Sequence, residues 1–207
     1  MSIPLAVSDP SPARSIHIEP AGPAWQLIMQ SGVGLWARVG LTVADFLTQE
    51  LGLSEEQQGQ ADVLMLDGMP VDDPATAIVP PNARLALAAG LPGIVGLSLK
   101  KDSAIKVLRA TITHFEQDSP DPRPGRVTLC LYSLVLPLLA GHFLRRGVLI
   151  SHQQFQRYAG RSPSDNCRLD GRVWPAAELA RELAGAPPAE FLLTAVITPE
   201  TEGQPHV

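Results

Sequence analysis

The stretch that decides the predicted fold is LTVADFLTQELGL, residues 41–53. Thr42 followed three residues later by Asp45 is typical of a helix N-cap. The apolar residues of the stretch recur at helical spacing, which puts them on one face: Val43, Phe46, Leu47 and Leu51. Gly52 follows where a helix commonly ends in a left-handed conformation. The sequence therefore predicts one amphipathic helix that begins near Thr42.

Short apolar runs on both sides of this helix predict strands. SIHIE (15–19) is a β-branched run, with residues 25–29 or 35–39 as its expected partner and SGVG (31–34) as turn material. DVLMLDGMPVDD (62–73) predicts a strand, a tight turn at Asp67-Gly68 and a short return strand limited by Pro70 and Pro74. In NARLALAAG (82–90), Leu85 and Leu87 alternate as in a last strand.

The order strand, strand, helix, strand, short strand, strand over about residues 15–93 resembles the β-grasp (ubiquitin-like) fold. The residue pattern of GLTVADFLTQELGL and VLMLDGMPVDD is similar to that of the sulfur-carrier branch of this fold, which is used in thiamine and molybdopterin synthesis. The resemblance implies a last strand that reaches a terminal glycine pair. Gly90-Leu91-Pro92-Gly93 is no such pair, because the chain continues to residue 207, and we do not expect sulfur carriage.

The second half of the chain predicts a separate, smaller α+β unit. A Pro-rich break, EQDSPDPRPGR (116–126), precedes it, WPAAELARELAG (174–185) predicts a helix and FLLTAVI (191–197) a strand. Leu-Asp-Gly occurs in both halves, at 66–68 and 169–171, which hints at a repeat, although we interpret it as coincidence. We therefore predict an α+β protein with these parts: a flexible tail (1–14), a β-grasp-like domain (15–93), a basic connector and Pro-rich linker (94–125), a C-terminal α+β unit (126–199) and a second tail (200–207).

AGLPGIVGLSLKKDSAIKVLR (89–109) is the leading candidate for a binding segment. It holds every lysine of the chain just behind glycines spaced three apart, with Asp102 as its one acidic residue. Glycine permits close backbone approach to an anion, and a local cationic patch attracts acidic ligands. The candidate binding residues are Gly90, Gly93, Gly96, Lys100, Lys101, Lys106 and Arg109. The competing interpretation is a solvated linker face, since neither a Walker A motif nor a dinucleotide fingerprint is present.

Two other features support alternative functions. Cys167 lies in the polar stretch SPSDNCRLDG beside Arg168, a cation that can lower a thiol pKa, so it is the candidate nucleophile of an enzyme. An inert cysteine is the competing interpretation, and we expect Cys130 to lie in the core. The uncharged run 127–144 is just long enough for a membrane span, but Pro137, Gly141 and His142 favour a buried strand and helix.

The composition of the chain favours some classes of function over others. The net charge of −5 argues against nucleic-acid binding, and a charged fraction of only 18% favours self-association or a partner. The N-terminus lacks the features of a signal peptide, so we expect a cytoplasmic protein. Histidine spacing indicates no metal site, and we predict no cofactor. The sequence favours a non-catalytic binding or adaptor module for an acidic protein surface or a phosphorylated small molecule. The alternatives are an enzyme component of a cofactor or sulfur pathway that uses Cys167, and a membrane-associated protein.

Overall fold

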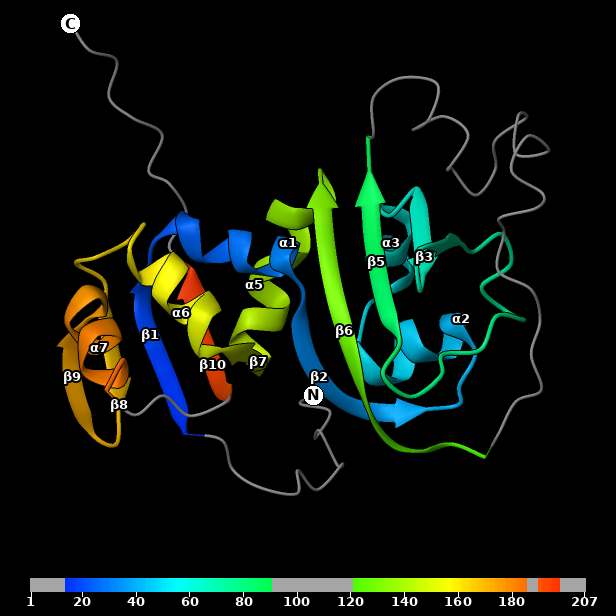
Figure 1. The fold of residues 1–207 in the computed structure, drawn as a ribbon. Helices are drawn as coiled ribbons and strands as arrows, with labels where there is room; N and C mark the ends of the chain where they lie inside the picture. Colours follow the sequence, from blue (N-terminus) through cyan, green and yellow to red (C-terminus); the bar gives the residue numbers. More distant parts are fainter. Residues whose placement is uncertain (1–13, 91–120, 186–189, 198–207) are drawn as a thin grey trace, which may run out of the picture. The chain divides into compact units, whose positions relative to one another are not determined.

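The computed structural model describes residues 14–90, 121–185 and 190–197, and it contains both helices and strands, which confirms the α+β class (Figure 1). The chain divides into two compact units, one within Gly32–Leu139 and the other formed by Ser11–Ser31 together with Ala140–Val207. These ranges differ from the domain limits predicted from the sequence. The predicted tails, apart from Arg14, and residues 94–120 of the predicted connector lie outside the described residues.

The first unit contains five strands, which are neighbours in the order β4-β3-β5-β6-β2 and form mixed pairs. The strands are β2 (Val33–Val39), β3 (Val63–Leu66), β4 (Met69–Pro70), β5 (Arg84–Ala89) and β6 (Arg123–Ser133). β2 is antiparallel to β6, β6 is parallel to β5, and β3 is antiparallel to both β5 and β4. The parallel pair therefore lies within these five strands, where both of its strands have two neighbours.

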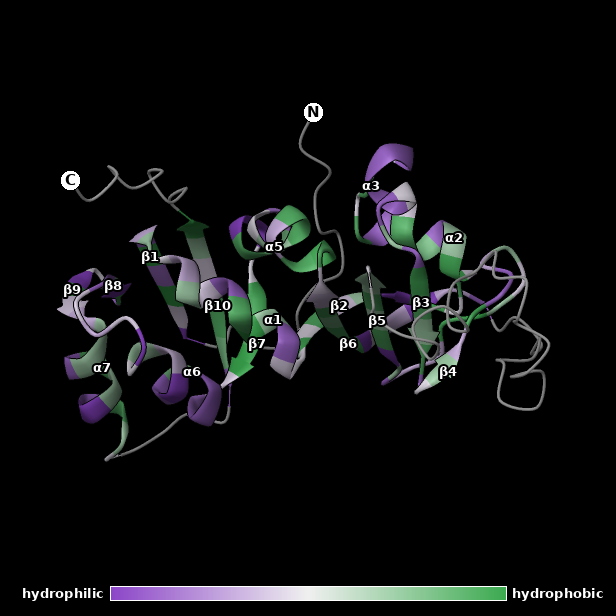
Figure 2. Ribbon diagram, turned by 90° about the horizontal axis from the view of Figure 1, so that it is seen from above, coloured by the Kyte–Doolittle hydropathy of each residue, from purple (hydrophilic) through white to green (hydrophobic). Residues whose placement is uncertain are grey.

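The predicted helix exists and is capped as expected. α2 (Val43–Asp45) begins after Thr42, whose hydroxyl accepts a hydrogen bond from the Asp45 backbone N–H at 3.1 Å. The chain continues as a π-helical turn, Phe46–Glu50, in which the Leu51 N–H donates to the Phe46 carbonyl, and Gly52 then takes a φ of 66°. The four apolar residues predicted for one face are all buried. A one-turn helix, α3 (Glu55–Gly59), follows; it has no buried residue and is purple in Figure 2.

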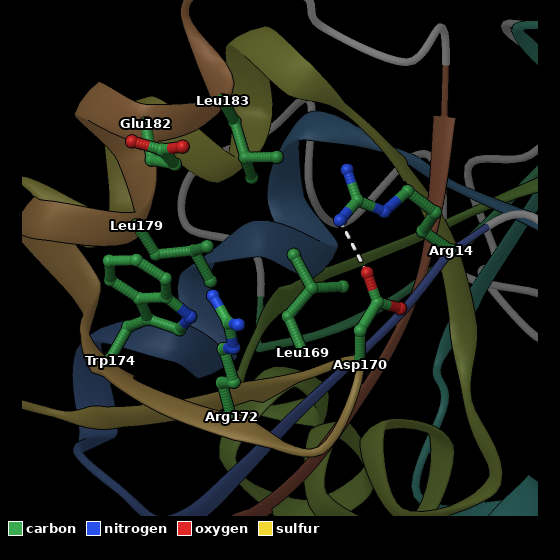
Figure 3. A pocket seen from close by; sticks show the side chains of 8 residues that line it. All are labelled: Arg14, Leu169, Asp170, Arg172, Trp174, Leu179, Glu182 and Leu183. Atoms are coloured by element: carbon green, nitrogen blue, oxygen red, sulfur yellow. Dashed lines mark hydrogen bonds and ion pairs between the residues drawn. The ribbon is translucent and has the colours of Figure 1, made fainter.

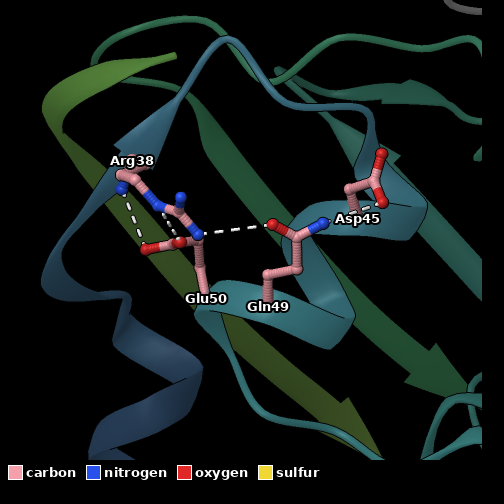
Figure 4. Close-up of polar contacts among 4 residues, drawn as sticks. All are labelled: Arg38, Asp45, Gln49 and Glu50. Carbon is pink, nitrogen blue, oxygen red and sulfur yellow. Dashed lines mark hydrogen bonds and ion pairs between the residues drawn. The ribbon is translucent and has the colours of Figure 1, made fainter. Parts of the chain in front are cut away.

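Glu50, the last residue of the π-helical turn, forms hydrogen bonds with strand β2 (Figure 4). Its two carboxylate oxygens accept from the Arg38 side-chain Nε at 2.7 Å and from the Arg38 backbone N–H at 2.9 Å. Gln49 accepts a longer hydrogen bond from the same guanidinium and donates to Asp45 at 3.0 Å. The helix is thus held by hydrogen bonds as well as by its apolar face.

One face of the strands of the first unit forms the core of that unit. The register places Leu85 beside Leu129 and Leu87 beside Leu131, and all four are buried. Figures 1 and 2 show that α2 and α3 lie on the same side of these strands. The Asp67-Gly68 hairpin between β3 and β4 forms as predicted, because φ is positive at both turn residues (51° and 82°).

The second unit contains five strands, which are neighbours in the order β7-β10-β1-β8-β9. Its strands are β1 (Ser15–Ala21), β7 (Val148–Ser151), β8 (Asn166–Leu169), β9 (Arg172–Pro175) and β10 (Glu190–Ile197). Its helices are α1 (Ile28–Ser31) with the preceding 3-10 turn η1 (Pro23–Leu27), α6 (His152–Ala159) and α7 (Ala176–Leu183). The helix α5 (Val135–Arg146) spans the point at which the chain divides between the units.

The predicted partners of the first strand are wrong. β1 pairs in parallel with β10 and antiparallel with β8, whereas residues 25–29 are helical and 35–39 belong to β2, which pairs with β6. The apolar run 127–144 divides between β6 and α5, as the strand-and-helix interpretation predicts. None of the helices in the described part of the chain has the length and apolar character needed to cross a membrane.

The five strands of each unit follow the same pattern of directions. From one end of the order to the other, the neighbours are antiparallel, parallel, antiparallel and antiparallel in both units. The Leu-Asp-Gly sequences occupy the equivalent hairpins β3–β4 and β8–β9. The chain order differs, because the third strand is β5 in the first unit and the N-terminal β1 in the second. If the two Leu-Asp-Gly sequences are a coincidence, the shared pattern of strand directions must be one as well.

Candidate functional site

Gly90 is the one predicted binding residue that the structure describes. It directly follows β5 with a φ of 64°, and a Cβ added there would lie 2.6 Å from Cδ1 of Leu134. Glycine is required at this position for the turn and for close packing, which explains it without any ligand. Gly93, Gly96, Lys100, Lys101, Lys106 and Arg109 lie outside the described residues, and their role remains a prediction.

The basic segment connects two strands of a single sheet. β5 and β6 are neighbouring and parallel, and the chain must return from the end of β5 to the start of β6 between residues 90 and 122. Parallel neighbours cannot be joined by a tight hairpin, so a long crossover is required here. The segment therefore belongs to the connectivity of the first unit, whereas the sequence predicts a connector between two domains.

The face of the first unit's strands opposite the leucines carries a polar cluster, which we call the Arg84 face. It consists of Arg84, Ala86, Thr128, Cys130 and Tyr132, which alternate with the buried leucines along β5 and β6. The Arg84 guanidinium donates to the Tyr132 hydroxyl at 3.5 Å. A Cβ at Gly32 would lie 2.9 Å from Thr128 and 3.1 Å from the guanidinium, so the missing side chain leaves room for Arg84.

Arg84 is the exposed cation of this face. Its backbone N–H donates to Asp67 at 2.7 Å, but no carboxylate in the described ranges forms an ion pair with its guanidinium. The hydrogen bond with Tyr132 raises the pKa of Arg84 against the opposing effect of burial. Arg84 is therefore a permanently charged donor that can bind an anion. The neighbouring Cys130 is buried, and burial raises the pKa of its thiol.

Cys167 lies in a different environment from the polar stretch predicted. It is a fully buried residue of strand β8, and its thiol lies 3.9 Å from the Asp165 carbonyl oxygen. Burial, and secondarily the charge of Asp165, raises the pKa of Cys167 to about 12. The adjacent Arg168 is exposed, because successive side chains of a strand point to opposite faces. Sequence adjacency therefore brings no cation to the thiol, and the environment favours the inert interpretation.

The ranges that the structure describes contain no cluster of residues that would support a metal site. No group of three or more His, Cys, Asp or Glu side chains is placed to hold a metal ion there. The histidines are used locally: His17 lies between Thr194 and Glu19, at 2.9 and 3.1 Å, and His142 contacts Arg146. The imidazole Nε2 of His152 is buried and has no hydrogen-bond partner among the residues that the structure describes.

The second unit contains a pocket that sequence reasoning missed (Figure 3). It has a volume of about 460 Å³ and lies between the β8–β9 hairpin, helix α7 and the start of β1. Three leucines, one tryptophan and four charged residues line it: Leu169, Leu179, Leu183, Trp174, Arg14, Asp170, Arg172 and Glu182. The missed signal is the Arg-x-Trp of strand β9, whose alternation puts both side chains on one face.

Comparisons of the chain with models of protein families, with curated proteins and with solved structures find no match. The likeness to the sulfur-carrier branch of the β-grasp fold therefore remains a prediction from the order of elements and the residue pattern, and function has to be argued from the sites themselves.

Proposed function

We propose that the protein is a non-catalytic binding module whose ligand is an acidic protein surface or a phosphorylated small molecule. The observation that carries the proposal is the exposed guanidinium of Arg84, which has no carboxylate partner in the described ranges. An arginine presents a planar set of donors that matches carboxylate and phosphate oxygens. Tyr132 and Thr128 add hydroxyl groups on the same face of the sheet.

The connectivity of the first unit supports including the basic segment in this function. Residues 91–120 join the C-terminal end of β5 to β6, the two strands that carry the Arg84 face. Lys100, Lys101, Lys106 and Arg109 occur within this connection in the sequence. The chain as a whole has a net charge of −5, so a group of cations within one connecting segment can attract acidic ligands to that segment.

We further propose that the first unit is β-grasp-like with a changed chain start. Its elements β2, α2, β3, β4 and β5 follow the predicted order. The place beside β2 expected for residues 15–19 is taken by β6, which is antiparallel to β2. This arrangement keeps one helix-covered mixed sheet while it supplies one strand from the C-terminal side.

The binding proposal is tested by titration with two anionic probes, fluorescein-labelled hexaglutamate and inorganic pyrophosphate. Arg84→Gln should weaken binding about threefold to tenfold, the loss expected for one charge-assisted contact that is partly exposed to water. The quadruple variant K100Q/K101Q/K106Q/R109Q should abolish binding, and added salt should weaken binding to the unaltered protein.

The matched control is Arg145→Gln, which removes an exposed arginine of α5 that does not belong to the Arg84 face. It should bind both probes as the unaltered protein does. Equal affinity of all the variants, or an equal loss in R145Q and R84Q, would contradict the proposal.

A further inference from the structure

We propose that the pocket of the second unit binds a small zwitterion with an apolar side chain, of the size of an amino acid or a dipeptide. This site is separate from the Arg84 face, since none of its lining residues belongs to the first unit. Its volume of about 460 Å³ lies within the range of about 300–1,000 Å³ found for small-molecule sites.

The lining of the pocket is more polar than apolar, and its apolar part comes from three leucines and a tryptophan. Leu169 of β8 and Leu179 and Leu183 of α7 are all buried, and each lines the pocket. Trp174, which is half-buried, forms a wall beside them (Figure 3). Because these leucines are already buried, the indole ring of Trp174 is the main apolar surface that an aliphatic or aromatic group of a ligand can contact.

The charges around the pocket decide the class of ligand. Arg14 and Asp170 form an ion pair with each other and so largely neutralise one another. Arg172 and Glu182 have no ion-pair partner in the described part of the chain, and both are exposed. One positive and one negative charge therefore remain for the ligand.

These two charges come from different elements. Arg172 extends from strand β9 between Trp174 and Leu169, whereas Glu182 lies on helix α7 beyond Trp174 and Leu179 (Figure 3). A carboxylate next to Arg172 and an ammonium group next to Glu182 would complement both charges. A purely anionic or purely cationic ligand would leave one of them without a complement.

The test uses L-leucine and L-leucyl-L-leucine as probes, followed by NMR through the indole N–H signal of Trp174, which is assigned with Trp174→Phe. N-acetyl-L-leucine lacks the ammonium group and L-leucinamide lacks the carboxylate. Both zwitterions should shift the Trp174 signal, and each analogue should bind about tenfold more weakly, the loss expected for one charge-assisted hydrogen bond.

Two variants assign the contacts. Arg172→Gln should weaken binding of leucine but leave binding of leucinamide unchanged, and Glu182→Gln should weaken leucine but leave N-acetyl-leucine unchanged. Arg181→Gln is the control, because Arg181 is an exposed residue of the same helix that does not line the pocket. The proposal is overturned if neither zwitterion shifts Trp174, if the analogues bind as well as leucine, or if R172Q and E182Q behave like R181Q.

Discussion

Asp67 and Asp170 adopt the same backbone conformation in equivalent hairpins of the two units. Their φ values are 51° and 49°, and the glycines that follow have φ values of 82° and 77°. Each turn follows a buried leucine and leads to an edge strand. Positive φ at both central residues is the geometry of the tightest hairpins, so the two Asp-Gly pairs are equivalent in structure as well as in sequence.

The glycines of these turns should each be needed for stability. A Cβ at Gly68 or Gly171 meets no atom within 4 Å, so replacement by alanine costs only the backbone strain of a positive φ. We expect Gly68→Ala and Gly171→Ala each to lower the free energy of unfolding by about 1–2 kcal/mol in urea denaturation. Gly59→Ala is the control, because Gly59 also has open space but lies in a helix, and it should be neutral or stabilising. If the three alanine substitutions lowered the free energy of unfolding equally, backbone strain at positive φ would not be the cause.

Gly90 should be more sensitive than the turn glycines, because an alanine there is both strained and too close to Leu134. We expect Gly90→Ala to destabilise the protein by more than Gly68→Ala does. Leu134 is 61% exposed, so Leu134→Ala alone should have a small effect. The double variant should recover part of the loss, and a double-mutant cycle measures that coupling. Strict additivity of the two changes would show that Leu134 is not the cause.

Cys167 should resist alkylation in the folded protein. Because its pKa is raised to about 12, almost no thiolate exists at pH 7–8, and burial denies access to iodoacetamide. Labelling followed by peptide mass spectrometry should show modification of Cys167 only under unfolding conditions. Fast labelling of the native protein below pH 7 would instead restore the enzyme alternative.

The raised pKa of Cys167 predicts that the folded protein loses stability at alkaline pH. The folded state holds the thiol proton more tightly than the unfolded state, so the contribution is complete below the unfolded pKa near 9 and is lost as the pH rises towards 12. Its slope is at most about 1.4 kcal/mol per pH unit. Cys167→Ala should remove this part of the pH dependence in urea denaturation measured between pH 8 and 11. An unchanged slope in the variant would exclude Cys167 as its source.

Glu50 should contribute more to stability than a typical surface acid. Its side chain is only 9% exposed, and it accepts two hydrogen bonds from Arg38. Glu50→Gln keeps the shape but puts an amide group against one of the two donors, so we expect a loss of about 1–3 kcal/mol. Glu56→Gln, on the exposed surface of α3, should change stability by less than about 0.5 kcal/mol. Thermal unfolding of both variants tests the difference.

Sequence reasoning succeeded where the signal is local. The Thr42 cap, the buried face of α2, the left-handed Gly52 and the Asp67-Gly68 hairpin all depend on residues close together in the chain. For Cys167 the structure favours the inert interpretation, but the cysteine lies in a buried strand and not in a polar loop. A polar neighbourhood in sequence says nothing about which face of a strand is covered. The pocket of the second unit was missed, since Arg14 and Glu182 come together only through the pairing of β1 with β8 and the packing of α7.

The sequence by itself determined the helix that begins after Thr42, the Asp67-Gly68 turn and the alternation along strand β5, because capping and turn hydrogen bonds and side-chain periodicity act within a few residues. Only the tertiary structure decided which strands are neighbours: β1 pairs with β10 from the far end of the chain, and β6 enters between β2 and β5. Backbone N–H and C=O groups are the same in every strand. The choice of partner therefore depends on which apolar faces are buried together, a property of the folded chain as a whole.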